Sequence, residues 1–381
     1  MKSGLKHGYT TGACAAAAAR GAALMLREQR LVDAVEIILP TGASARFTLH
    51  GQILGKSSAS CFVIKDAGDD PDITNGAEIH ATLAIEPSTE HEIKITGGIG
   101  VGRVTKPGLA AKVGESAINP VPRRMIFEAV NELLSMHCSQ AAIIVTISIP
   151  NGEELAKKTL NERLGIVGGL SILGTTGIVK PISTKAWTDT IDCSVDVALA
   201  SGSDTVVLST GRTSEQAVQK YLENHPPSIH PYQGGSLSPS LDKGRVGEGL
   251  AVESFIMMGD HVGYALRSCK NRGVKNIVLA GQFAKLLKIA CGHEQTHVSS
   301  SELDLRNLAL WCATAPGLAG FEQLSLEANT ARQVLVDSDY DAALIRLVCE
   351  KARSAALQMA PGLAVRVLLA GYQGEVLHYT G

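Results

Sequence analysis

The chain has 381 residues, of which 45% are hydrophobic and 19% charged, a composition that excludes a disordered or fibrous protein. A chain of this length usually forms more than one core, so we expect two domains. The net charge of −2 and the aromatic content of 4% exclude a general attraction to nucleic acids or anionic membranes and a surface for stacking bases.

The cysteines and the first residues indicate a reducing compartment. Eight cysteines are spread along the chain and no CxxC pair occurs, which is typical of reduced thiols rather than of disulfides or a zinc site. The opening residues, MKSGLKHGYTTG, lack the apolar stretch of a secretion signal. The alanine-rich segment 13–26 is too short to span a bilayer. We therefore expect a cytoplasmic protein without a membrane partner.

The first part of the chain predicts a mixed or antiparallel sheet with a covering helix. The run Ala13–Arg27 predicts a helix with a threonine as N-cap. Alternating or β-branched runs predict strands at residues 35–39, 45–49, 61–64, 78–85, 92–95 and 141–149. Two more helices are expected, at residues 123–137 after Pro122 and at residues 152–160.

From Ser183 onward, helices and strands alternate. We expect helices at residues 183–200, from 214 onward, at 248–270 and at 285–291, strands at 204–209 and 275–280, and a long loop at 224–247. Such alternation predicts a parallel sheet covered by helices. The predicted fold is α/β with two domains: an N-terminal mixed-sheet α+β domain (residues 1–180) with glycine-rich substrate loops, and a C-terminal Rossmann-like parallel α/β domain (residues 181–381).

Residues 293–297 (HEQTH) match the HExxH pattern of zinc hydrolases. In that pattern two histidines one helical turn apart bind the metal and the glutamate acts as base. The context argues against it, because Gly292 is a natural end for the preceding helix and three serines follow at 299–301. A zinc hydrolase using His293 and His297 stays as an alternative, and we favour His297 as a polar residue in a loop.

Two loops in the first half invite a functional interpretation. The block Gly97–Gly102 follows a strand, but its spacing fails the dinucleotide fingerprint and no helix follows it. It is either a loop that closes on a ligand or a tight corner. The block Lys65–Asp72 (KDAGDDPD) contains four aspartates without EF-hand spacing. It is either an ordinary turn or a source of carboxylates for proton uptake or for a cationic ligand.

Arginines and glycines mark two further segments. Arg123 and Arg124 stand at a predicted helix start, where the helix dipole disfavours cations. This placement favours a clamp for carboxylates, with a solvated helix end as the alternative. Residues 165–177 contain five glycines, which suit either backbone amides facing a ligand or closely packed crossing backbones. Cys14 is expected to be a small core residue rather than a nucleophile.

Taken in order, these blocks resemble one family. The blocks are His7–Gly12 (HGYTTG), Lys65–Thr74 (KDAGDDPDIT), Gly98–Leu109 (GIGVGRVTKPGL), Ala117–Met125 (AINPVPRRM) and Arg163–Pro181 (RLGIVGGLSILGTTGIVKP). They resemble the signatures of the cobalt-precorrin-5B C1-methyltransferases of anaerobic cobalamin synthesis, the CbiD type. The resemblance covers nearly the whole chain and is looser in the second half, where Ser209–Arg212, Gly259–Gly263 and Gly281–His297 carry it.

The resemblance implies transfer of a methyl group from S-adenosylmethionine to C1 of a ring-contracted tetrapyrrole, giving cobalt-precorrin-6A. Cobalt would arrive only as part of the substrate, and no metal held by the protein is implied. The expected partners are the small-molecule tetrapyrrole and no nucleic acid, and a homo-oligomer and transient contacts with neighbouring pathway enzymes are possible. A non-catalytic alternative is a carrier that hands a tetrapyrrole between enzymes.

The implied chemistry assigns roles to particular residues. The substrate carries acetate and propionate groups, so a basic rim is expected from Lys65, Arg103, Lys106, Arg123 and Arg124. The candidates for proton uptake or for balancing the sulfonium charge are Asp66, Asp69, Asp70 and His297. Two rival sites are expected for the methyl donor: the segment with Gly168, Gly169, Ser171, Gly174, Thr175 and Thr176, and the strand ends at Gly211 and Gly281.

Overall fold

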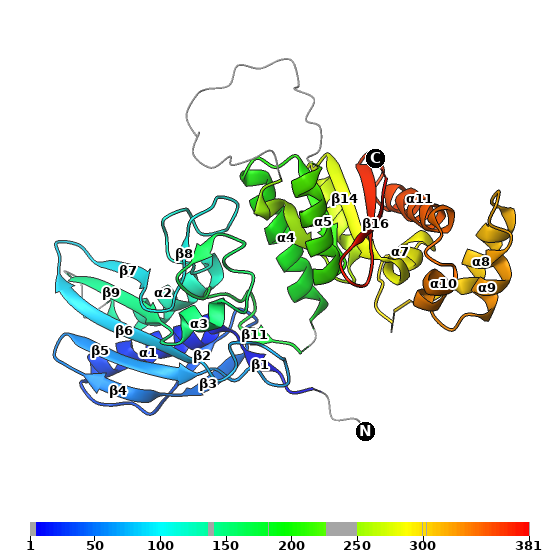
Figure 1. Ribbon diagram of the computed structural model, residues 1–381. Helices are drawn as coiled ribbons and strands as arrows, with labels where there is room; N and C mark the ends of the chain where they lie inside the picture. The colour runs from blue at the N-terminus through cyan, green and yellow to red at the C-terminus, as the bar shows by residue number, and fades with distance from the viewer. Residues whose placement is uncertain are drawn as a thin grey trace, which may run out of the picture. The chain divides into compact units, whose positions relative to one another are not determined.

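The computed structural model describes residues 5–135, 141–181, 183–225, 250–298, 300–301 and 303–380 (Figure 1). The chain separates into two compact units, Met1–Thr184 (unit 1) and Lys185–Gly381 (unit 2). Both units combine helices with sheets, so the fold is mixed α/β. Within the described ranges, no helix has the length and apolar character needed to cross a membrane.

A five-stranded sheet forms the body of unit 1, with strand order β4-β5-β6-β9-β7. Its neighbouring strands run antiparallel, apart from the parallel pair β7–β9. The strands are β4 (His50–Leu54), β5 (Ser58–Ile64), β6 (Glu78–Pro87), β7 (Glu92–Gly97) and β9 (Ala141–Ser148), and a separate hairpin joins β2 (Ala34–Ile38) to β3 (Ser44–Thr48). The predicted strands of this part are confirmed, and β4 was not predicted.

Two long helices complete the core of unit 1. Helix α1 (Thr11–Glu28) begins at the predicted N-cap, where the Thr10 hydroxyl accepts a hydrogen bond of 3.2 Å from the Ala13 amide. Its alanines are buried, and their small side chains let the helix approach the sheet and helix α2 (Pro120–Leu134) closely. Proline at the first helical position places the start of α2 three residues before the predicted one. Helix α3 (Gly152–Ala156) is a single turn, shorter than predicted.

Four two-residue strands tie the loops of unit 1 together. They are β1 (Gly8–Tyr9), β8 (Arg103–Val104), β10 (Ile166–Val167) and β11 (Ile178–Val179). Strand β1 pairs with β11, and β8 pairs with β10, both antiparallel. The end of unit 1 therefore returns to its beginning.

The sheet of unit 2 has the strand order β13-β12-β14-β15-β16. The strands are β12 (Thr205–Ser209), β13 (Phe255–Met257), β14 (Asn276–Gln282), β15 (Ala364–Ala370) and β16 (Val376–Tyr379). The first four in space are parallel, and β16 is antiparallel to β15. Strand β12 comes first in sequence but lies between β13 and β14, so the chain changes direction across the sheet there.

Helices cover both faces of this sheet. Helix α5 (Arg212–Asn224) packs on one face, where its Val218 and Leu222 share a buried cluster with Val207 and Val278. The other face shares a buried cluster with α4 (Thr184–Ala200), α6 (Val262–Asn271), α7 (Phe283–Ala290) and α11 (Ala342–Met359). Beyond α7, this cluster continues into α8 (Leu305–Thr314) and α10 (Ala331–Asp337), with α9 (Phe321–Glu327) packed beside them. Figure 1 shows α5 on one side of the sheet and α7 and α11 on the other.

One predicted helix of unit 2 is wrong. Residues 248–270 do not form a continuous helix, because a 3₁₀ turn (Val252–Ser254) and strand β13 precede α6. Phe255, Ile256 and Met257 form a short apolar run that reads equally well as a buried helix segment. The pairing of Phe255 with Val207 of β12 makes it a strand. The predicted loop at 224–247 falls almost wholly on residues outside those described, as does the end of the predicted helix 123–137.

Candidate functional site

The motif blocks of the first half of the chain meet in unit 1. Besides the pairs β1–β11 and β8–β10, isolated bridges connect His7 with Gly68, Val101 with Leu170, and Ile118 with Ile172. Each block therefore contacts another block that is distant in sequence. The five blocks form one connected backbone network around the start of α1.

The glycines of this network allow backbones to touch. The Leu170 amide donates to the Gly100 carbonyl at 2.9 Å. A Cβ atom on Gly169 would lie 2.3 Å from the Gly100 carbonyl carbon, which is shorter than any contact that a side chain can make without a shift of the backbone. Gly100 itself has φ +69° and faces the Ile149 carbonyl. The block Gly97–Gly102 is therefore a tight corner packed against the segment 165–177.

The segment 165–177 is divided between interior and surface. Gly169 and Ser171 are buried, and the Ser171 hydroxyl donates to Asn161 Oδ1 at 3.4 Å. Gly174 has φ +125° and packs on Thr10. Residues 169–172 are therefore a segment of closely packed, crossing backbone. Because Gly169 and Ser171 are buried, the structure does not support their predicted contact with the methyl donor. Those residues of the predicted donor site that lie exposed are Gly168, Thr175 and Thr176.

Lys65 does not belong to a substrate-facing rim. Its side chain has no exposed surface, and its Nζ lies 2.6 Å from Asp72 Oδ2. Asp72 also accepts the Thr74 amide and hydroxyl at 2.8 and 2.6 Å. Burial raises the pKa of Asp72, but the hydrogen bonds from Lys65 and Thr74 outweigh burial and leave that pKa below its usual value. The predicted contact of Lys65 with substrate is replaced by a structural ion pair.

The other aspartates of this loop lie nearer to solvent. Asp66 is exposed and forms an ion pair with Lys6 at 2.6 Å. The Lys6 hydrogen bond, together with the Gly68 amide, lowers the pKa of Asp66. Asp69 accepts the Lys6 amide at 2.6 Å, and Asp70 is half-buried with an interaction of its own. The structure thus places these three aspartates together, beside the bridge between His7 and Gly68.

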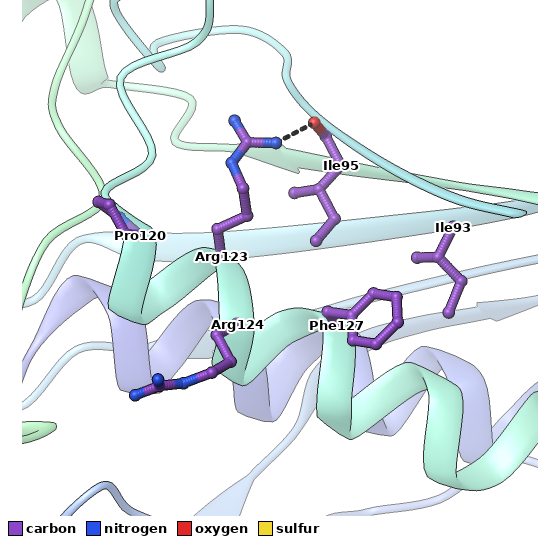
Figure 2. Close-up of a pocket in the computed structure, with 6 residues that line it drawn as sticks. All are labelled: Ile93, Ile95, Pro120, Arg123, Arg124 and Phe127. Atoms are coloured by element: carbon purple, nitrogen blue, oxygen red, sulfur yellow. Dashed lines mark hydrogen bonds between the residues drawn. The ribbon is translucent and has the colours of Figure 1, made fainter. Parts of the chain in front are cut away.

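An open groove of about 420 Å³ runs between α2 and β7 (Figure 2). It is lined by Ile93, Ile95, Pro120, Arg123, Arg124 and Phe127. In Figure 2 the Arg123 guanidinium turns toward β7, where it donates to the Ile95 carbonyl at 3.0 Å, while Arg124 extends the other way. Phe127 is 42% exposed, which is unusual for a phenylalanine. We name this surface the α2 groove; Phe127 was not among the predicted site residues.

Arg103 and Lys106 belong to the loop that follows β7. Arg103 is exposed and donates to the Gly114 carbonyl, and its backbone bridges to Ser116. The Ser116 hydroxyl in turn accepts the Gly97 amide at 2.7 Å, so this loop is fastened to the end of β7. The stem of Lys106 packs against Gly165. Arg103 and Arg123 are therefore both connected to β7, and their contact with substrate stays a prediction.

The second predicted donor site lies at the carboxyl ends of the strands in unit 2. Gly211 ends the turn after β12 and is the N-cap of α5, and no atom lies within 4 Å of the place a Cβ atom would occupy. Gly281 is buried near the end of β14, beside Thr210. Next to them, the Ser209 hydroxyl is fully buried and has no hydrogen-bond partner among the described atoms.

A polar cluster fills the same edge of the sheet after β13. Asp260 accepts the Thr296 hydroxyl at 2.6 Å and pairs with Lys285 of α7. Burial raises the pKa of Asp260, but Lys285 and Thr296 outweigh it and lower the pKa. Lys288 is buried and donates to the Thr296 and Ser301 carbonyls at 3.1 and 2.8 Å. Sequence analysis missed Asp260, because the strand that precedes it was read as helix.

His297 follows this cluster in sequence and is exposed, with an interaction of its own. It belongs to unit 2, whereas the aspartates with which it was grouped belong to unit 1. The structure therefore does not assemble the four predicted acid/base residues within one unit.

The HExxH segment is not helical. Residues 293–298 form bends and turns, and Glu294 is held by Arg267 through two hydrogen bonds of 2.7 and 2.8 Å. Among the residues that the structure describes, no three His, Cys, Asp or Glu side chains are close enough together to bind a metal ion. This segment therefore lacks the helical geometry on which the zinc hydrolase alternative depends.

Cys14 is a core residue, as expected. It is buried in the first turns of α1, and burial raises the pKa of its thiol to about 12. A thiol with this pKa is not a nucleophile at neutral pH.

Comparison with known proteins agrees with the blocks that meet in unit 1. Residues 1–181 match the family described as CbiD, and residues 295–381 match the family described as the CbiD C-terminal domain. The chain belongs to the CbiD family. The first CbiD match contains every motif block of unit 1, and the second begins in the polar cluster of unit 2.

Named relatives span almost the whole chain. The cobalt-precorrin-5B C(1)-methyltransferase of Geobacter sp. (strain M21) is 58% identical over 376 residues, which are 99% of this chain and 98% of the relative. The protein of the same name from Geobacter sulfurreducens is 60% identical over 379 residues, 98% of each chain. A solved structure of the cobalamin biosynthesis protein CbiD from Archaeoglobus fulgidus is 28% identical, covering 76% of this chain and 81% of that chain, with a TM-score of 0.39.

Proposed function

We propose that this chain catalyses the S-adenosylmethionine-dependent methylation of C1 of cobalt-precorrin-5B. The observation that carries the proposal is the full-length similarity, at 58–60% identity, to relatives that bear the name of this reaction. The proposal includes the division into two domains near residue 180 and a Rossmann-like character of unit 2. The four parallel strands covered on both faces support the latter.

The α2 groove supports the substrate part of the proposal. A tetrapyrrole is a broad apolar ring with carboxylates at its edge. The groove offers exposed apolar surface from Phe127, with the Arg123 guanidinium on the side of β7 and the Arg124 side chain extending the other way. Arginine pairs with carboxylates through two parallel hydrogen bonds, which fixes the orientation of the bound group. In this arrangement the ring contacts the apolar side chains and the acid groups reach the arginines.

The residues of unit 2 fit a methyl donor at the carboxyl edge of the sheet. S-adenosylmethionine supplies an electrophilic methyl group on a sulfonium, so positioning and exclusion of water are the main tasks of the protein. Ser209 offers a buried hydroxyl without a partner, and Gly211 leaves open space beside it. Asp66, Asp69 and Asp70 of unit 1 and His297 of unit 2 remain proposed as groups that take up a proton or balance the sulfonium charge.

Label transfer tests the reaction. The full chain is incubated with methyl-labelled S-adenosylmethionine and enzymatically prepared cobalt-precorrin-5B, and the mass and position of the added group are determined. We expect one methyl group at C1. Binding of the macrocycle without transfer would instead support the tetrapyrrole carrier, and absence of both binding and transfer would contradict the proposal.

A further inference from the structure

We propose that the loop Ser209–Ser214, between β12 and α5, binds a carboxylate group of a ligand. We name it the α5 anion loop. The presence of an anion site is argued from the structure of unit 2 alone. The choice of carboxylate over other anions rests on the function proposed above.

The topology places this loop where parallel sheets bind ligands. Strand β12 lies between β13 and β14, and the helices that follow β12 and β14 cover opposite faces of the sheet. The carboxyl ends of β12 and β14 therefore form a topological switch point, at which a crevice opens between the two connections. Thr210 follows β12, and its amide donates to the Ala280 carbonyl of β14 at 3.0 Å.

The first turn of α5 presents amides without partners. The amides of Arg212, Thr213 and Ser214 make no hydrogen bond to any described residue, whereas the Glu215 amide already bonds to the Gly211 carbonyl at 3.0 Å. Gly211 has no side chain to cap the helix. Ser214 is only 1% exposed, so water has little access to it. Three free amides at the positive end of a helix attract an anion.

Ser209 supplies an independent observation. Its hydroxyl is fully buried and has no partner in the described part of the chain, which is unfavourable unless a ligand satisfies it. Side chains two residues apart on a strand point to the same face, and Val207 packs in the cluster of α5. The Ser209 hydroxyl is therefore directed to the face that α5 covers, at the end where the first turn of α5 begins.

The loop has room for a small planar anion. Nothing lies within 4 Å of the position of a Cβ atom on Gly211. The turn after β15 borders this space, since a Cβ atom on Gly374 would lie 4.0 Å from Thr213 Cγ2. The charges in the turn are balanced: Arg212 is exposed and basic, and Glu215 is buried and has an interaction of its own. The attraction for an anion therefore comes from the free amides and the Ser209 hydroxyl, since the Ser214 hydroxyl already donates to the Gly211 carbonyl at 2.8 Å.

Two ligands of the proposed reaction carry carboxylates: the amino-acid end of S-adenosylmethionine and the acid side chains of the tetrapyrrole. Binding constants for S-adenosylmethionine, for its decarboxylated form and for uroporphyrin, a stable macrocycle with carboxylate side chains, separate the two sources. The measurements are made by isothermal titration calorimetry on the full chain.

The first variant is Ser209→Ala, with Ser254→Ala as the matched control. Ser254 is also fully buried and lies at the opposite end of the sheet, where its hydroxyl bonds to Ser203 at 2.8 Å. Ser209→Ala should weaken binding of the carboxylate ligand about tenfold, the effect of one lost hydrogen bond to a charged group. It should not lower the thermal midpoint of the free chain, because the hydroxyl has no partner to lose. Ser254→Ala should lower the thermal midpoint, because it removes the hydrogen bond to Ser203, and should leave binding of the carboxylate ligand unchanged.

The second pair of variants tests the helix amides. Arg212→Pro removes the first amide of α5 together with the guanidinium, and Arg212→Ala removes the guanidinium alone. Proline is tolerated at the first position of a helix, and the extended Gly211 (φ −179°, ψ 174°) is compatible with a following proline. We expect Arg212→Pro to bind the carboxylate ligand more weakly than Arg212→Ala does.

The outcomes separate this proposal from the proposed function. Weaker binding of S-adenosylmethionine by Ser209→Ala, with unchanged binding of its decarboxylated form, assigns the loop to the donor. Weaker binding of uroporphyrin alone assigns it to the substrate. If every ligand binds the variants as it binds the wild type, while the wild type transfers label, the anion loop is overturned and the reaction stands.

If the wild type neither binds these ligands nor transfers label, the proposed function fails, and inorganic phosphate then tests the loop alone. Broadening of the phosphorus resonance by the wild type, reduced in Ser209→Ala and Arg212→Pro, would support an anion site. Equal broadening by the three proteins would overturn it.

Discussion

Lys65 and Asp72 form an ion pair inside unit 1: Lys65 Nζ lies 2.6 Å from Asp72 Oδ2, and the lysine side chain has no exposed surface. A buried charge is stable only while its partner remains. We expect Lys65→Met to lower the free energy of unfolding by about 3 kcal/mol, because Asp72 then loses its counter-charge. Urea denaturation measures this. Lys6→Met, which breaks the exposed pair with Asp66, should change the free energy little.

The same pair predicts a dependence of stability on acid. The pKa of Asp72 in the folded chain lies below its usual value, so the folded chain binds that proton less readily than the unfolded chain does. The stabilisation is present above the unfolded pKa of about 3.9 and is lost as pH falls through the lower folded pKa. Asp72→Asn should therefore lose less stability than wild type between pH 6 and pH 3. An equal loss in both proteins would refute this assignment.

Close packing of glycines predicts different costs for two neighbouring substitutions. Gly169→Ala places a Cβ atom 2.3 Å from the Gly100 carbonyl carbon, so one of the two backbones must shift. We expect a loss of about 3 kcal/mol, the upper range for overpacking. Gly168 has φ +81° and open surroundings, so Gly168→Ala should cost only about 1 kcal/mol of left-handed strain. Thermal denaturation of both variants shows which of them loses more stability. An equal loss in the two variants would contradict the close packing of Gly169 against Gly100.

The α2 groove predicts a specific loss of macrocycle binding. Phe127→Ala removes the exposed aromatic ring from the groove, and we expect the dissociation constant for uroporphyrin to rise about tenfold. Leu310→Ala is the control, since Leu310 is 63% exposed in unit 2, outside the groove. Fluorescence titration of the macrocycle measures both. If Phe127→Ala and the wild type bind uroporphyrin with similar affinity, the α2 groove is not the binding site of the macrocycle.

The HExxH segment predicts a variant without consequence for the reaction. Glu294 pairs with Arg267, and both side chains are about half exposed. Glu294→Gln should lower the free energy of unfolding by less than about 1 kcal/mol and leave methyl transfer unchanged. Label transfer and zinc analysis of the purified chain check this. If the wild type contains stoichiometric zinc and the variant loses both the zinc and the activity, the zinc hydrolase alternative is supported.

Sequence patterns predicted the elements whose local signal is strong. Strands β2, β3 and β5 alternate buried and exposed residues, as a sheet with one covered face requires. The alanine run and Thr10 likewise indicated α1 and its cap. Strand β4 was not predicted because a histidine, a glycine and a glutamine occupy its first three positions, and Ile53 is its only β-branched residue. Strand β13 was not predicted because an apolar run of three residues is too short to show whether its pattern is that of a strand or of a helix.

The sequence indicated which segments belong to the candidate site, but it did not indicate which side chains contact one another there. The grouping of Arg123 and Arg124 predicted a basic surface, and both line the α2 groove. Nothing in the sequence shows that Lys65 faces inward, since its partner Asp72 looks no different from Asp66, Asp69 or Asp70. The pairing of Asp260 with Lys285 was equally hidden, because it joins the turn after the unrecognised strand β13 to the first turn of α7.

The pairing of β1 with β11 has a consequence for synthesis of the chain on the ribosome. Gly8 and Tyr9 are made long before their partners, Val179 and Ile178, which emerge only when unit 1 is nearly complete. Contacts between such distant residues close large loops and form slowly. Unit 1 therefore cannot finish folding while it is being translated. Gly8 and Tyr9 stay without their strand partners until the last part of the unit has been made, and chaperones can bind them until then.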